Sequence, residues 1–156
     1  MNNYDDHRIS FPVPNGWHIK TDESGNILYN DPSDEETWCF VQLGGLRQST
    51  PNKPVPTALD FLTQIYEQEL TAGVAAIFSL SDRAFVEWEE KTINDGRDFI
   101  VYHFHLASNA ESGDIQMADF SLAAPILPLD TMNVSRKRKL FSDQMKLARF
   151  HIWRKG

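Results

Sequence analysis

The sequence predicts an α+β domain in which helices pack on an antiparallel sheet, and three observations lead to this class. Residues 84–124 contain three strand-like segments in succession, and the Asn-Asp-Gly sequence at 94–96 is a strong hairpin signal between the first two. Shorter extended segments occupy most of residues 8–47. Two helical segments, one starting near residue 57 and one near residue 133, are separated by the run of strands and do not alternate with single strands.

Length and composition limit the possible functions. The chain has 156 residues, which fits a single domain spanning residues 1–156. Its net charge of −7 disfavours nucleic acid as a partner, because binding to phosphates needs a surplus of lysine and arginine. The single cysteine, Cys39, excludes an internal disulfide and a multi-cysteine metal site, and we expect it to be buried. We predict a cytoplasmic protein, because the polar N-terminus lacks a signal-peptide pattern and no apolar run reaches about 18 residues.

Short strands precede the first helix. Residues 8–20 consist of two extended pieces joined by a turn at Asn15-Gly16. A short strand is expected at 26–31 and a stronger one at 36–47. We expect Trp17, which follows the turn, to anchor the N-terminal segment in the core.

The two helices have different signals. Thr57 and Asp60 have the spacing of a capping box, although Asp stands where Glu or Gln is preferred. Four apolar residues then share one helical face: Ala58, Phe61, Leu62 and Ile65. The second helix is expected from about Asn133 to Trp153, with apolar residues at helical spacing: Phe141, Met145, Ala148 and Ile152.

The segment GRDFIVYHFHL at 96–106 is apolar on both faces of the predicted strand. Because side chains alternate along a strand, one face is uniformly apolar and should meet the helices: Ile100, Tyr102, Phe104 and Leu106. The other face carries Phe99, Val101, His103 and His105. Either a second layer covers this face, or its apolar side chains form an exposed patch that marks a binding site.

Several motifs in a fixed order give the chain a family resemblance. They are FPVPNGW at 11–17, NILYN followed by WCFVQL, ALDFLTQIYEQEL at 58–70, GRDFIVYHF at 96–104 and the last amphipathic helix. With these motifs the chain resembles the PsbP-like fold group and its DcrB-like family, and it is most similar to the Eag-type chaperones of type VI secretion effectors. The fold group hosts very different functions, so the fold alone does not define the role.

The resemblance implies a function and a set of partner-binding residues. Eag-type chaperones are small cytoplasmic homodimers that shield the N-terminal transmembrane helices of an effector. We expect no cofactor in this chain. The residues implied to contact the effector are Ile27, Val41, Gln64, Phe99, Val101 and His103. His103 departs from the amide side chain expected at its position, which would make binding sensitive to pH.

The same residues allow other functions. Another protein-binding module, such as an immunity protein or a regulator of a small GTPase, is the main alternative. His103 and His105 on one strand face could belong to a metal site, but a zinc site needs further ligands that the sequence does not supply. Glutamates at 87, 89 and 90 have no nucleophile or phosphate loop nearby, so no enzymatic activity is predicted. The basic run at 135–139 is expected to be a solvated surface, or a contact for an acidic partner.

Overall fold

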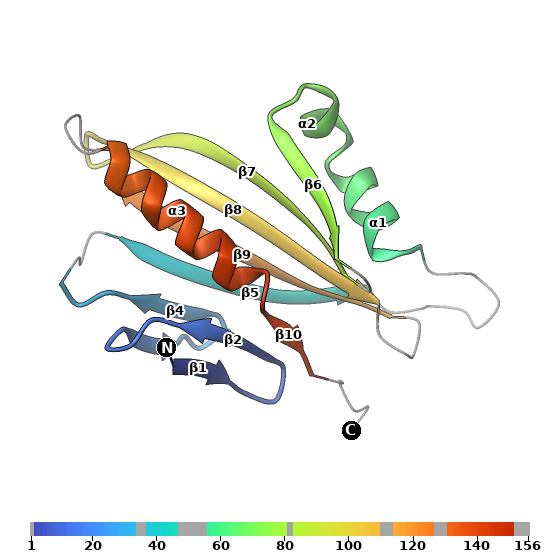
Figure 1. Ribbon diagram of the computed structural model, residues 1–156, viewed down its shortest axis with the longest axis horizontal. Coiled ribbons are helices and arrows are strands. Elements are labelled where there is room, and N and C mark those ends of the chain that lie inside the picture. The colour runs from blue at the N-terminus through green and yellow to red at the C-terminus, as the bar shows by residue number, and fades with distance from the viewer. Residues whose placement is uncertain are drawn as a thin grey trace.

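A seven-stranded antiparallel sheet forms the body of the protein in the computed structural model, which describes residues 2–33, 37–46, 56–80, 83–109, 114–126 and 131–151. From one edge to the other, its strands are β3 (His18–Thr21), β4 (Ile27–Asn30), β5 (Trp38–Leu46), β9 (Ile115–Pro125), β8 (Arg97–Asn109), β7 (Arg83–Asn94) and β6 (Ala75–Leu80). With helices packed on this sheet, the predicted α+β class is confirmed (Figure 1).

The predicted meander is present as β7, β8 and β9. Asp95 and Gly96 have φ angles of 52° and 74°, so both turn residues are left-handed, as a two-residue hairpin of the type I′ class requires. β6 pairs with the outer side of β7 and extends the meander to a fourth strand. β6 was not predicted, although its apolar run AAIFSL is typical of a strand.

A second, three-stranded sheet contains β1 (Asn2–Asp5), β2 (Ile9–Val13) and β10 (Arg149–Phe150), with β2 in the middle. The two extended pieces expected within residues 8–20 are therefore confirmed as β2 and β3, but they belong to different sheets. The turn between them contains Gly16 with a φ angle of 82°, a conformation that glycine adopts without strain.

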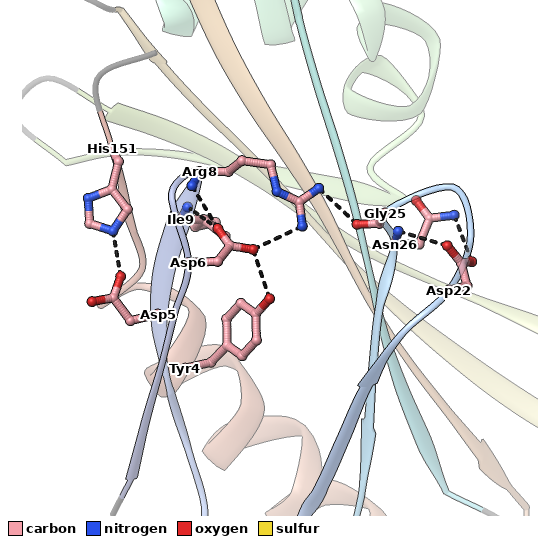
Figure 2. Close-up of polar contacts among 9 residues, drawn as sticks. All are labelled: Tyr4, Asp5, Asp6, Arg8, Ile9, Asp22, Gly25, Asn26 and His151. Carbon is pink, nitrogen blue, oxygen red and sulfur yellow. Dashed lines mark hydrogen bonds and ion pairs between the residues drawn. The ribbon is translucent and has the colours of Figure 1, made fainter. Parts of the chain in front are cut away.

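Hydrogen bonds to Asp6 hold the turn between β1 and β2. Its carboxylate accepts hydrogen bonds from the Tyr4 hydroxyl at 2.7 Å and from the backbone N–H groups of Arg8 and Ile9 at 2.7 and 3.0 Å. The Arg8 guanidinium donates to Asp6 at 2.9 Å and to the carbonyl oxygen of Gly25 at 2.8 Å. Figure 2 shows that this network connects the small sheet to the turn before β4.

Helices pack on opposite faces of the large sheet. α3 (Thr131–Met145) contacts β2, β8 and β9, while α1 (Ala58–Ile65) contacts β6, β7 and β8 and continues into α2 (Glu67–Thr71). The backbone N–H of Asp60 donates to the Thr57 hydroxyl at 3.1 Å, so the predicted N-cap is confirmed. No described helix is long and apolar enough to span a membrane.

The last helix is shorter than predicted. It ends at Met145 because the chain then turns, and Arg149 and Phe150 pair with Ser10 and Ile9 of β2. Pairing of β10 with β2, which is distant in sequence, therefore prevails over the helical spacing of the apolar residues at the end of the chain. Ile152 and Trp153, which the prediction included, lie outside the described residues.

The main core lies between the large sheet, the small sheet and α3. The face of β8 that was expected to meet the helices is buried there through Ile100, Tyr102, Phe104 and Leu106. Phe120 of β9 forms an edge-on contact with Phe11 of β2, with ring centroids 5.6 Å apart. Trp17 packs against this core beside Tyr29, at 5.8 Å between ring centroids, in agreement with the predicted anchor.

Candidate functional site

The face of the large sheet that points away from the main core is only partly covered. The pairing of residues between neighbouring strands shows which side chains lie on this face. One cross-strand row contains Leu28, Phe40, Ser121 and His103. The next row contains Trp38, Ala123 and Val101. Phe99, two residues before Val101 in β8, lies on the same face of the strand. All eight side chains are partly exposed. We call these eight residues the open face.

α1 covers the neighbouring part of the same sheet face. Ala58 and Leu62 of α1 pack in a second, smaller core against four buried strand residues: Ala84, Val86, Ala107 and Ile115. α1 is anchored there because its first N–H donates to the Asn109 side chain at 2.8 Å. The two alternatives left open by the sequence are therefore both realised, since a helix covers one part of this face and another part is open.

Three of the predicted partner-binding residues lie together on the open face: Phe99, Val101 and His103. Gln64 is exposed on α1, the helix that packs on the same side of the sheet. It therefore lies beside the covered part of the sheet face and is not among the eight open-face residues.

The other two predicted residues, Ile27 and Val41, belong to the opposite face. They are paired with each other, Val41 is paired with Phe120, and all three are fully buried in the main core. Their inclusion in an accessible binding site is therefore wrong for this structure. Because side chains alternate, the residues that reach the open face are their chain neighbours, Leu28 and Phe40.

Four apolar residues of the open face were not predicted as site residues: Leu28, Trp38, Phe40 and Ala123. The available signal was the alternation along 26–31 and 36–47, which separates each strand into two faces. It does not tell which of two apolar faces a helix will cover, and that information comes from the positions of α3 and α1.

A polar cluster borders the open face where α1 begins to cover the sheet. The imidazole of His103 stacks on the indole of Trp88, with ring centroids 4.1 Å apart and an interplanar angle of 15°. Its Nε2 lies 3.1 Å from the Glu90 carboxylate, and its Nδ1 lies 3.9 Å from Oδ1 of Asp119. The second distance is too long for a hydrogen bond, so Asp119 acts on His103 as a nearby charge.

The two histidines of β8 have pKa values shifted in opposite directions. Burial alone would lower the pKa of His103, but the carboxylates of Asp119 and Glu90 outweigh it and raise the pKa above its usual value. Burial lowers the pKa of His105, and the opposing effect of Asp119 does not cancel it. The Tyr66 hydroxyl of the segment joining α1 and α2 lies 2.6 Å from Nδ1 of His105.

Two polar atoms in the cluster have no hydrogen-bond partner among the described residues: Nε1 of Trp88 and Oδ1 of Asp119. Both atoms are buried, and an unpaired buried polar group is costly.

The other end of the open face is a groove of about 420 Å³. It is lined by His18, Ile19, Lys20, Leu28, Asn30 and Trp38. The ammonium group of Lys20 lies 5.3 Å from the centroid of the Trp38 ring, which is within the range of a cation–π interaction. The face thus has a basic group at one end, acidic groups at the other and apolar side chains between them.

Other candidates from the sequence have ordinary structural roles. Cys39 is buried, and burial raises its pKa to about 12, so it is no nucleophile. It lines a small cavity of about 40 Å³ beneath α3. Arg138 from the basic run donates to Glu89 at 3.2 Å and lies over the Tyr102 ring. Among the described residues, no group of three or more metal-ligating side chains comes together.

Comparison with known proteins defines a fold and no family. No family model matches the chain, and no curated protein matches it in sequence. LpqN, described as involved in cell envelope biogenesis of Mycobacterium tuberculosis, has a similar structure, with a TM-score of 0.57 and 16% identity over 92% of this chain and 83% of that one.

Two further structures are similar over much of the chain. CyanoP, the cyanobacterial PsbP of Synechocystis sp. PCC 6803, has a TM-score of 0.47 and 13% identity over 96% of this chain and 92% of that one. A protein from Bacteroides thetaiotaomicron VPI-5482 has a TM-score of 0.50 and 14% identity, and the match covers 75% of this chain but only 38% of that longer one. At these identities the similarities concern the fold alone.

Proposed function

We propose that this chain is a cytoplasmic chaperone or adaptor that binds the apolar N-terminal segments of a type VI secretion effector and shields them from water. The observation that carries the proposal is the open face, where six apolar side chains lie together and partly exposed on a rigid sheet: Leu28, Trp38, Phe40, Phe99, Val101 and Ala123. A contiguous apolar patch of this kind is typical of a binding surface.

The dimensions of the open face suit an α-helix. Its apolar side chains come from four neighbouring strands, β4, β5, β9 and β8. Since neighbouring strands lie about 4.8 Å apart, these four span about 14 Å, and a helix with its side chains is about 10–12 Å wide. Apolar surface buried by such a helix contributes roughly 25 cal/mol per Å² before the costs of association.

The polar cluster can position the bound helix. Apolar contacts alone would allow the helix to slide along the sheet. His103 and Ser121 are the polar side chains of the open face, and they favour a polar side chain of the client at one place. A serine, threonine or amide side chain in an otherwise apolar helix would supply both a donor and an acceptor.

A co-expression experiment tests this function with a defined probe. The probe is a soluble carrier protein fused to an apolar helical segment of about 20 residues with one central serine. We expect the wild-type chain to keep the fusion soluble and to co-purify with it. Val101→Asp, which places a charge on the open face between Phe99 and His103, should abolish both effects.

Ile93→Asp is the matched control. Ile93 is 72% exposed, lies on β7 and points to the opposite side of the sheet from the open face. A negative charge at position 93 should therefore leave the fusion protein soluble. Equal solubility of the fusion with wild type and Val101→Asp would refute binding through the open face. Capture of the carrier without the apolar segment would favour another kind of protein-binding module, such as an immunity protein or a GTPase regulator.

A further inference from the structure

The groove at the β3 end of the open face is lined by polar side chains as well as apolar ones. His18 is paired with Asn30 and Lys20 with Leu28, so these four residues form two neighbouring rows at the edge of the sheet. Leu28 is in turn paired with Phe40 of the open face. The groove is therefore a continuation of the apolar surface towards β3, and a client that covers this surface reaches the groove as well.

Asn30 is the most enclosed polar residue of this groove. It is 6% exposed, and no other described residue forms a hydrogen bond with its side chain. A buried amide normally has hydrogen-bond partners for its N–H donors and for its oxygen. Because the Asn30 side chain lines the groove, a polar group bound there can supply the missing partner.

The positive charge of the groove comes from Lys20. Its ammonium group lies over the Trp38 ring, 5.3 Å from the ring centroid, and it forms no ion pair with another described residue. Asp22, the carboxylate closest to Lys20 in the chain, accepts hydrogen bonds from Asn26 within its own turn (Figure 2). Asp31, directly after β4, lines the small cavity beneath α3 on the other side of the sheet. The ammonium group is therefore accessible to an anionic group of a partner.

We propose that this groove binds a carboxylate of the client, so that the preferred client is an apolar segment with a glutamate or aspartate at the border of its apolar surface. The inference rests on the proposed function, because the same segment must lie on the open face. One carboxylate oxygen accepts a charge-assisted hydrogen bond from Lys20, and the other accepts one from the Asn30 amide. A single lysine matches the charge of a carboxylate better than that of a phosphate, which carries nearly two negative charges.

Competition among carrier fusions tests the proposal without assuming the direction of the bound helix. A mixture of fusions carries either one glutamate or one glutamine at each position of the apolar segment in turn, and mass spectrometry measures which fusions the wild-type chain captures. At positions that face the groove, we expect the glutamate form to be captured about three- to fivefold more than the glutamine form. At positions that face apolar side chains, the glutamine form should be captured better, because burying a charge costs more than burying an amide.

Three variants assign the preference for glutamate to Lys20. Lys20→Met keeps an apolar stem without the charge and should remove the preference, whereas Lys20→Arg should retain it. Lys91→Met is the matched control and should also retain it, because Lys91 is exposed on β7 and points to the opposite side of the sheet.

The outcomes separate this inference from the proposed function. Capture without a preference for glutamate at any position would overturn the inference and leave binding on the open face intact. A preference that survives in Lys20→Met, or one that Lys91→Met also removes, would overturn the inference as well. Capture of no fusion by the wild-type chain would overturn both proposals.

Discussion

The two faces of the large sheet differ in what covers them. The face under α3 and the small sheet is completely packed, and Ile27, Val41, Phe104 and Phe120 form a buried row across four strands. The next row on the opposite face, Leu28, Phe40, Ser121 and His103, is partly exposed although two of its members are large and apolar. Composition therefore does not distinguish a core from a binding surface in this protein.

Coverage by helices decides the role of each face. α1 has only eight residues and packs at the β6–β8 side, so it cannot reach β4 and β5. α3 has fifteen residues and, with β2, covers the centre of its face. The short helix leaves an apolar area free, which is the physical basis of the proposed client binding.

The largest expected effect is the difference in stability between a variant that loses an aromatic ring from the packed face and a variant that loses one from the open face. Phe120→Ala should lower the free energy of unfolding by about 3–5 kcal/mol, because it leaves a cavity in a fully buried site. Phe40→Ala should cost less than half of that, since Phe40 is already partly exposed. Urea unfolding of both variants measures the difference, and equal costs would show that the open face is core.

A smaller effect is expected at the turn that holds the small sheet. Burial alone would raise the pKa of Asp6, but hydrogen bonds from Tyr4, Arg8 and Ile9 lower it to about 2. Asp6→Ala should lower the free energy of unfolding by about 1–3 kcal/mol at neutral pH. Glu23→Ala, in an exposed turn nearby, controls for the loss of a negative charge.

The pH dependence of Asp6 has a defined sign. Because its pKa is lower in the folded chain, its stabilising contribution is present above the unfolded pKa of about 3.9 and is lost as the pH falls through about 2. Thermal unfolding of wild type and Asp6→Ala between pH 2 and pH 6 should therefore converge towards the acid end. A constant difference over this range would contradict the assigned role of the carboxylate.

The smallest expected effects concern the two histidines beside the open face, and they have opposite signs. The folded pKa of His103 is raised, so its contribution is present below the unfolded pKa of about 6.5 and is lost as the pH rises through the folded value. The folded pKa of His105 is lowered, so its protonation destabilises the fold as the pH falls below about 6.5.

Two single variants separate these contributions. Thermal unfolding across neutral pH should show that His103→Gln makes stability rise more steeply with pH, while His105→Gln makes it rise less steeply. The groups that face the pair are Glu90 on β7, Asp119 on β9 and Tyr66 beside α1. Changes of the same sign in both variants would show that these carboxylates do not favour protonated His103.

The parts of the fold that could be predicted depend on local signals. The β7–β8–β9 meander follows from alternation and the Asn-Asp-Gly turn, and the start of α1 follows from the Thr57 cap. β10 could not be predicted, since a two-residue strand forms only because β2 offers a partner about 140 residues earlier in the chain. The same long-range pairing explains why α3 ends before the predicted helix does.

The candidate site was also predicted only in part, because the sequence does not tell which strand face the helices cover. Phe99 and Val101 were recognisable because apolar residues occupied a strand face that should have been polar. Ile27 and Val41 were assigned to this face although their neighbours Leu28 and Phe40 occupy it. The sequence divides a strand into two faces, but only the packing of α3 and α1 determines which of them is open.

Site-specific photo-crosslinking from the open face tests the central claim most directly. A photoreactive phenylalanine analogue replaces Phe40 on the open face or Ile93 on the opposite face, and each variant is co-expressed with the carrier fused to the apolar helix. We predict that the analogue at position 40 cross-links to the apolar segment and that the analogue at position 93 does not. Cross-linking at position 93 but not at position 40 would contradict binding of the client on the open face.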